Sequence, residues 1–137
     1  MVLLDRDNVG ASFASWPAET RFITPTFATN SIGMLDLNSV AIGTSPAVML
    51  GAEHPTGAEY AAYLRRLAQY FEFPVCGRTD VLAVTKVGDE FHIDIAEGSA
   101  RAKHVVWAAG EFQYPLVKGF PGFEHCRHTA TVERYQT

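Results

Sequence analysis

The chain has 137 residues, of which 47% are hydrophobic and 19% are charged, and its formal net charge is -4 at pH 7. This length and composition predict at most one packed globular domain and exclude a disordered or fibrous protein, because natural domains of roughly 100 to 150 residues can bury a real core. The acidic balance excludes nucleic acid as a partner, since binding to a phosphate backbone relies on clustered Lys and Arg side chains.

Sequence patterns also argue against a membrane protein and against a disulfide framework. No apolar run approaches the ~20 residues that span a bilayer, and the N-terminus does not have the pattern of a signal peptide. We therefore expect a cytoplasmic protein with no membrane contact. The only cysteines, Cys76 and Cys126, are far apart and form no CxxC motif, so redox chemistry would have to use a cofactor.

The N-terminal part is predicted to contain one strand and a long irregular segment. Residues 2–4 form a short apolar run that ends at Asp5, which is typical of a buried parallel strand that reaches the edge of its sheet. Residues 8–55 have no sustained period because Gly and Pro interrupt them repeatedly. Apolar side chains in this segment predict packing against another surface, for which a large flat cofactor would be suitable: Phe13, Trp16, Phe22, Ile23, Phe27 and Met34.

A helix is predicted from residue 57 to about residue 72. It begins with a capping box, in which the Thr56 hydroxyl and the Glu59 carboxylate each satisfy one backbone amide of the first turn. Pro74 marks its end. Apolar side chains recur at steps of three and four residues and form one stripe along it: Tyr60, Leu64, Leu67 and Phe71.

Three strands are predicted after the helix. Val81–Val87 and Glu90–Ile95 are joined at Gly88, and the second run alternates apolar and polar residues, which indicates a β-hairpin with one wet face. After a turn at residues 97–99, a third strand over residues 102–109 stops at Gly110. The simplest assembly of these strands is an antiparallel meander.

The end of that third strand carries a resemblance to a known group of enzymes. The apolar run from Val105 to Gly110, followed by Pro115 and by the sequence GFPG at residues 119–122, resembles the strand-to-linker segment of flavin-containing monooxygenases and related flavoproteins with two dinucleotide sites. Ala109 stands where those proteins usually have Thr, while Gly110 still permits close backbone approach to a ligand. A plain buried strand that ends in a glycine turn is the alternative interpretation.

The N-terminus resembles the same group in the expected order. Asp5 after its apolar run, and the loop that contains Gly10, are similar to the second strand and to the Gly-Gly-x-Trp-like loop of these flavoproteins. The resemblance implies that Asp5 accepts hydrogen bonds from the adenosine ribose of FAD, and that the backbone at Val81 meets the adenine ring. A solvated strand end is the alternative for Asp5. The implied cofactor-binding residues are Asp5, Arg6, Gly10, Ser12, Trp16, Val81, Ala109 and Gly110.

The loop after Asp5 has two possible roles in this comparison. By resemblance, Trp16, Arg21, Phe22 and Thr24 would lie toward the isoalloxazine ring. The alternative is that these side chains pack in the protein core.

The resemblance implies an α/β fold. Residues 1–122 would form a partial Rossmann-like FAD-binding domain with an antiparallel β-meander, and residues 123–137 a linker toward a missing NAD(P)-binding domain. Neither of the GxGxxG loops that would hold the pyrophosphates of FAD and of NADPH or NADH occurs in the sequence.

The expected function is therefore that of a fragment of an FAD-dependent, NAD(P)H-linked oxidoreductase. It would be monooxygenase-like and would act on a small-molecule substrate, with hydride passing from nicotinamide to flavin. The isolated chain is expected to be inactive and to bind FAD weakly or not at all. A stand-alone, non-catalytic binding or interaction domain derived from the same scaffold is the alternative.

No catalytic or metal-binding side chain is predicted, because the cofactor would supply the chemistry. His125, Cys126 and His128 form a short cluster to which Cys76 could add a fourth ligand. Their spacing fits no zinc motif, so an exposed linker with incidental histidines is the preferred interpretation.

Overall fold

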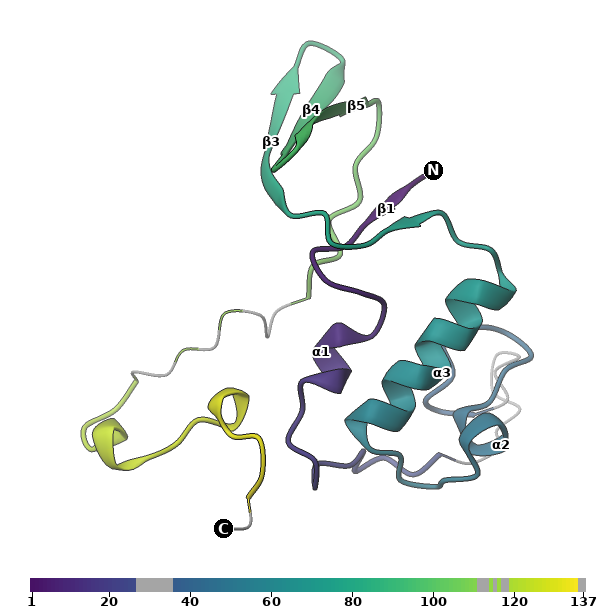
Figure 1. Cartoon of the computed structure of the whole chain (residues 1–137), viewed down its shortest axis with the longest axis vertical. Helices are drawn as coiled ribbons and strands as arrows, with labels where there is room; N and C mark the ends of the chain where they lie inside the picture. The colour runs from purple at the N-terminus through teal and green to yellow at the C-terminus, as the bar shows by residue number, and fades with distance from the viewer. Residues whose placement is uncertain (27–35, 111–113, 115, 117–118, 136–137) are drawn as a thin grey trace.

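The computed structural model describes residues 1–26, 36–110, 114, 116 and 119–135. Figure 1 shows helices α1, α2 and α3 at one end of the molecule, the meander projecting at the other end, and the C-terminal segment running along one side. In chain order the elements are β1 (Leu3–Leu4), α1 (Ala11–Ala14), α2 (Pro46–Leu50), α3 (Gly57–Tyr70), β2 (Val75–Cys76), β3 (Val81–Val87), β4 (Glu90–Ile95), β5 (Gly98–Ala102) and the 3-10 turns η2 (Phe123–His125) and η3 (Thr129–Thr131).

Helix α3 begins at the predicted capping box. The Thr56 backbone N–H donates to Glu59 Oε2 at 2.7 Å, and the Glu59 N–H donates to Thr56 Oγ1 at 3.2 Å. The helix ends at Tyr70, slightly before the predicted end, because Glu72 adopts a left-handed backbone with φ of 50°. The predicted helix is thus confirmed, with its C-terminus shortened.

Aromatic side chains from α1, α3 and the segment between them form the core. The Tyr60 ring lies 4.8 Å from that of Phe13 and 4.5 Å from that of Phe22, measured between centroids. Tyr63 and Trp16 extend this cluster, with centroids 5.4 Å from Tyr60 and 5.2 Å from Phe13 respectively. The predicted packing of Phe13, Trp16 and Phe22 is confirmed, and their partners are side chains of this chain.

The same prediction is wrong for Ile23, which is 94% exposed. Ile23 lies in a bend directly after Phe22, and its side chain is exposed to solvent while the ring of Phe22 packs in the core. Phe27 and Met34 lie outside the described residues.

Helices α1 and α3 cross at two glycines. A Cβ atom at Gly57 would lie 2.1 Å from the Phe13 carbonyl oxygen, and one at Gly10 would lie 2.8 Å from the Cα of Ala61. These separations are shorter than any side chain can accept, so both positions need glycine if the two helices are to touch.

The segment over residues 8–55 is less irregular than its sequence pattern indicates. Besides α1 it contains α2, which begins at Pro46 after Ser45 and ends at Gly51 in the left-handed conformation. Each helix is too short for apolar residues to repeat at helical spacing, so periodicity could not reveal them.

Strand β1 pairs with β2 in parallel, with Leu3 opposite Val75 and Leu4 opposite Cys76. The predicted parallel strand is therefore confirmed. The prediction that it is buried is wrong, because Leu3 is 40% exposed. In the part of the chain that the structure describes, β1 has one neighbouring strand, and a single neighbour leaves the other edge open.

The hairpin of β3 and β4 has the predicted bounds, and β4 also pairs with β5 in antiparallel register. The predicted third strand over residues 102–109 is wrong, since β5 covers Gly98–Ala102 instead. The turn after Ile95 is tight, so Gly98 already pairs with Ile95 and Ala102 reaches Phe91 near the start of β4. Residues 105–109 therefore have no partner left on β4.

The C-terminal segment returns toward the start of the chain. The Ala18 N–H donates to the Glu133 carbonyl at 3.0 Å, and the Tyr135 N–H donates to Glu19 Oε2 at 3.3 Å. None of the described helices is both long and apolar enough to cross a membrane. With a parallel strand pair, helices and an antiparallel meander, the predicted α/β class is confirmed.

Candidate cofactor site

The candidate site lies where β1 and β2 end. The Asp5 N–H donates to the Cys76 carbonyl at 3.0 Å, the Thr79 N–H to the Asp5 carbonyl at 2.9 Å, and the Arg78 N–H to the Asp7 carbonyl at 2.8 Å. These bonds join the loop after β1 to the loop after β2, and we call this pair of loops the clamp, residues 5–8 and 77–80. In open α/β sheets, ligands bind at the carboxyl ends of the strands.

Asp5 is half-buried at the centre of the clamp. Its Oδ1 accepts a hydrogen bond from the Asp7 backbone N–H at 2.9 Å, which fixes the carboxylate relative to the chain. Among the described residues, Oδ2 accepts no hydrogen bond. A carboxylate can accept about four hydrogen bonds in total, so Asp5 keeps the capacity to bind a pair of hydroxyl groups.

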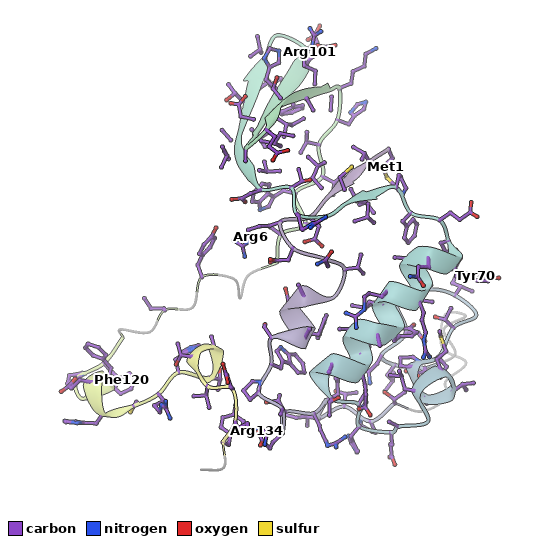
Figure 2. The ribbon with its side chains drawn as sticks, viewed as in Figure 1. Met1, Arg6, Tyr70, Arg101, Phe120 and Arg134 are labelled. Carbon is purple, nitrogen blue, oxygen red and sulfur yellow. The ribbon has the colours of Figure 1, made fainter. Side chains whose placement is uncertain are left out.

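Arg6 follows Asp5 and is exposed. Its Nε lies 3.7 Å from Asp7 Oδ2. Figure 2 shows Arg6 near the junction between the meander and the helical part of the molecule. An exposed ion pair of this kind adds little stability, so the guanidinium group is free to reorient toward a ligand at Asp5.

The sequence did not indicate Gly77, Arg78 or Thr79 as site residues. Arg78 has φ of 55°, an uncommon conformation for a residue with a side chain. A Cβ atom at Gly77 would lie 3.0 Å from the Asp7 carbonyl oxygen, so this glycine permits the close approach of the two loops. The only sequence feature that could have indicated these residues is a glycine, Gly77, directly after a short apolar strand.

A cavity of about 420 Å³ adjoins the clamp between β2 and α3. Asn8 and Gly77 belong both to the clamp and to the cavity wall, and Arg65 and Gln69 line it from α3. The clamp therefore borders a space that is open to solvent and has polar groups along its rim.

Val81 lies close to the clamp along the chain, two residues after Thr79. It is the first residue of β3 and pairs with Ile95, and the register shifts between Val81 and Ala83. Such a bulge redirects backbone groups at a strand end.

Gly10, Ser12 and Trp16 lie outside the clamp, in or next to α1. Gly10 precedes α1 in the left-handed conformation, with φ of 81°, against Ala61. Ser12 is exposed on α1, and its carbonyl accepts a hydrogen bond from the Ser15 hydroxyl at 2.9 Å. Trp16 packs in the aromatic core.

The other residues of this loop also contact the chain itself. Arg21 Nη1 donates to the His54 carbonyl at 3.0 Å, and the Thr24 carbonyl accepts a hydrogen bond from Asn38 Nδ2 at 3.1 Å. The Phe22 ring lies in the aromatic core. Of these residues Phe22 packs in the core, as Trp16 does, whereas Arg21 and Thr24 are exposed.

Ala109 and Gly110 follow β5 in a segment without regular secondary structure. Gly110 has φ of 75°, and a Cβ atom there would meet nothing within 4 Å. The glycine is required by its backbone conformation and not by crowding.

The cluster at residues 125–128 is held by local bonds. His128 Nδ1 accepts a hydrogen bond from the Ala130 N–H at 3.1 Å, and His125 Nε2 lies 3.8 Å from Glu124 Oε1. Across the described part of the chain, no group of three or more His, Cys, Asp or Glu residues is placed to hold a metal ion. Cys76 and Cys126 are free and exposed.

Curated relatives match about half of this chain. A CzcO-like oxidoreductase of Geobacillus kaustophilus is 37% identical over 67 residues, which are 49% of this chain and 19% of the relative. A CzcO oxidoreductase of Bacillus velezensis is 38% identical over 63 residues, 46% of this chain and 18% of the relative. The matched part thus spans about a fifth of the length of these relatives.

Solved structures show the same fold at low sequence identity. Bacillithiol disulfide reductase from Bacillus cereus superimposes with a TM-score of 0.63 at 20% identity, over 90% of this chain and 36% of that protein. A flavin-containing monooxygenase from Stenotrophomonas maltophilia gives 0.54 at 16% identity, over 79% of this chain and 37% of that protein. The family model described as pyridine nucleotide-disulphide oxidoreductase matches residues 1–137. The chain therefore belongs to the pyridine nucleotide-disulphide oxidoreductase family.

Proposed function

We propose that this chain supplies the adenosine-binding part of the FAD site in a flavin-dependent oxidoreductase. The observation that carries the proposal is the Asp5 carboxylate, which the clamp holds at the carboxyl end of β1 with one oxygen bonded to the backbone and acceptor capacity remaining. Two acceptors at a strand end suit the adjacent hydroxyl groups of a ribose. Family membership supports a flavin as the ligand.

The residues around Asp5 fit the rest of the adenosine. Gly77 leaves room for close approach, and Arg6 can move over the ligand because its ion pair with Asp7 is exposed. The backbone at the bulge of Val81 is proposed to meet the adenine ring. We assign the pyrophosphate to residues outside this sequence, because no GxGxxG loop occurs in it.

The chemistry of the whole protein forms part of the same proposal. Bound flavin would accept hydride from NADPH or NADH and pass electrons onward, in a monooxygenase-like reaction on a small-molecule substrate. Residues 1–122 would belong to the FAD domain of a cytoplasmic enzyme, and residues 123–137 would lead to the nicotinamide domain. The described side chains of this chain bind and orient the cofactor, and we assign them no proton transfer.

A comparison of FAD with FMN tests this assignment in the full-length protein that carries the chain. FMN has no adenosine, so a site built around Asp5 should bind FAD at least about tenfold more tightly, which corresponds to roughly 1.4 kcal/mol. Equilibrium titration of the apoprotein, followed by flavin fluorescence, measures both affinities. Equal affinity for the two flavins would remove adenosine binding from this chain, and failure to bind either would favour a non-catalytic interaction domain.

A further inference from the structure

A second cavity lies in the C-terminal segment, apart from the clamp. Its volume is about 450 Å³, and the described residues that line it all lie between Leu116 and Thr131. One short stretch of chain therefore forms its wall. Figure 2 shows Phe120, one of the lining residues, on the opposite side of the molecule from Tyr70 at the end of α3. No residue of the clamp belongs to the described wall, so the two sites are separate.

Three apolar residues form one part of the cavity wall: Leu116, Phe120 and Phe123. Leu116 is 81% exposed and Phe120 is 57% exposed, so neither side chain is packed in a core. Exposed apolar surface that lines a cavity favours a ligand with an apolar group, because binding removes that surface from water. A flat ring fits best, since it can stack on the phenyl rings.

The rest of the wall is polar and includes one arginine, Arg127. Among the described residues, the Arg127 guanidinium takes part in no ion pair. Glu124 is the only acid in the described wall, and its Oε1 lies 3.8 Å from Nε2 of His125, which does not line the cavity. Arg127 can therefore bind an anionic ligand, and the planar guanidinium matches the two oxygens of a carboxylate.

His128 adds a hydrogen-bond donor beside Arg127. Its Nδ1 accepts a hydrogen bond from the Ala130 N–H at 3.1 Å, so this nitrogen carries no proton. The neutral imidazole must then carry its proton on Nε2. In the part of the chain that the structure describes, Nε2 makes no hydrogen bond, and His128 lines the cavity. The Nε2–H group is thus a donor that a ligand oxygen can use.

We propose that this cavity binds a small aromatic carboxylate. Arg127 and His128 donate to the carboxylate, and the ring lies against Phe120 and Phe123. A metal ion does not fit the wall, because across the described residues no group of three or more His, Cys, Asp or Glu is placed to hold one. A polyphosphate does not fit either, since the described wall offers one arginine and also carries Glu124. The proposal does not depend on flavin binding at the clamp.

Protection of a cysteine from alkylation tests the proposal in the full-length protein. Cys126 lines the cavity, while Cys76 lies in β2 next to the clamp, and both thiols are free and exposed. Benzoate is the probe, and FAD is present in excess so that the flavin site is filled. Iodoacetamide is uncharged and does not compete for Arg127. Mass spectrometry of the two cysteine peptides measures the alkylation rate of each thiol.

We expect saturating benzoate to slow the alkylation of Cys126 at least about fivefold, because the reaction needs an accessible thiol, and to leave Cys76 unchanged. Arg127→Gln should raise the benzoate concentration for half-maximal protection at least about tenfold. Arg134→Gln is the matched control and should change it less than about twofold, since Arg134 is exposed and lies away from Phe120 in Figure 2. Acetate and benzyl alcohol each carry one half of the probe and should need at least about tenfold higher concentrations.

Equal protection of the wild type and of Arg127→Gln would overturn the proposal, and so would equal slowing at both cysteines. If Arg127→Gln does not fold by circular dichroism, the wild type decides: benzyl alcohol as effective as benzoate would overturn the role of the carboxylate. A Cys126 thiol that benzoate does not protect, or that iodoacetamide cannot reach because another part of the full-length protein fills the cavity, would also overturn it. None of these readouts measures flavin affinity, so a failure here is distinct from a failure of the proposed function.

Discussion

Glu59 accepts hydrogen bonds from the backbone N–H and from the side chain of Thr56, and these two bonds, in that order, lower the pKa of its carboxyl group. Arg21 adds a small electrostatic contribution in the same direction, and partial burial opposes it. Because the folded state holds the charged form, Glu59 stabilises the fold above its ordinary pKa of 4.5, and this stabilisation is lost as the pH falls through the lowered folded-state value.

Thr56→Ala should therefore destabilise the protein in a pH-dependent way. The N-cap and one bond to Glu59 are lost, at a cost of about 1 kcal/mol at pH 7. The difference from the wild type should shrink as the pH falls through the lowered folded-state pKa of Glu59. Urea unfolding at pH 7 and at a series of acidic pH values measures this change. Thr129→Ala, in the C-terminal turn η3, is the control and should show a small difference that does not change with pH. A constant deficit for Thr56→Ala would contradict the assigned role of Glu59.

Tyr60 should make the stability of the protein depend on pH in the alkaline range as well. Burial raises the pKa of Tyr60 to about 12, and the neighbouring Tyr63 and Asp36 add to the shift. The folded state therefore keeps a proton that the unfolded state releases near pH 10, so stability should fall as the pH rises above about 10.

Tyr60→Phe should lessen this alkaline loss of stability. The variant also loses the hydrogen bond to the Asn38 carbonyl, which should cost about 1 kcal/mol at pH 7. Unfolding curves at pH 7 and pH 11 separate the two effects. Tyr70→Phe is the matched control, since Tyr70 is exposed at the end of α3, where Figure 2 shows it. If both variants lose the same stability between pH 7 and pH 11, the burial of Tyr60 is not the cause of the loss of stability at alkaline pH.

At the scale of elements, the crossing of α1 and α3 gives a direct test of packing. Gly10 and Gly43 have nearly the same backbone angle, with φ of 81° and 80°, but only Gly10 faces a neighbouring helix. Replacing either by Ala introduces the strain of a left-handed residue, roughly 1 to 2 kcal/mol. Gly10→Ala must also push Ala61 away, which should cost a further ~1 to 3 kcal/mol. Thermal unfolding of the two variants measures this excess, and equal costs would show that α1 does not pack as closely as described.

Sequence patterns predicted the elements that are defined locally. The capping box at Thr56 specifies the start of α3, and alternation of side chains specifies β3 and β4 with their bounds. The third strand was misplaced because the apolar run after Val105 looks more like a strand than GSARA at residues 98–102. The position of the third strand is decided by its register with β4, and the tight turn after Ile95 fixes this register.

At the scale of the whole molecule, the site was only partly predictable for the same reason. Asp5 could be selected as a candidate because an acid after an apolar strand is a local pattern, and its role in binding stays a prediction. The clamp could not, since Gly77, Arg78 and Thr79 reach Asp5 and Asp7 only through a fold in which the intervening α3 has formed. The burial of Asp36, which is fully buried, could not be predicted either, because its hydrogen-bond partners Ser45 and Ala47 follow it by about ten residues in a segment without periodicity.

The affinity of the full-length protein for FAD, compared between Asp5→Asn and Asp7→Asn, tests the central claim most directly. The amide at position 5 loses charge-assisted bonds to the ribose, each worth roughly 1.5 to 3 kcal/mol, so we predict at least a tenfold weaker FAD affinity by titration of the apoprotein. Asp7→Asn removes an exposed ion pair with Arg6 and should change affinity by less than about threefold. Equal FAD affinity in the two variants would contradict the assignment of Asp5 as the ribose ligand.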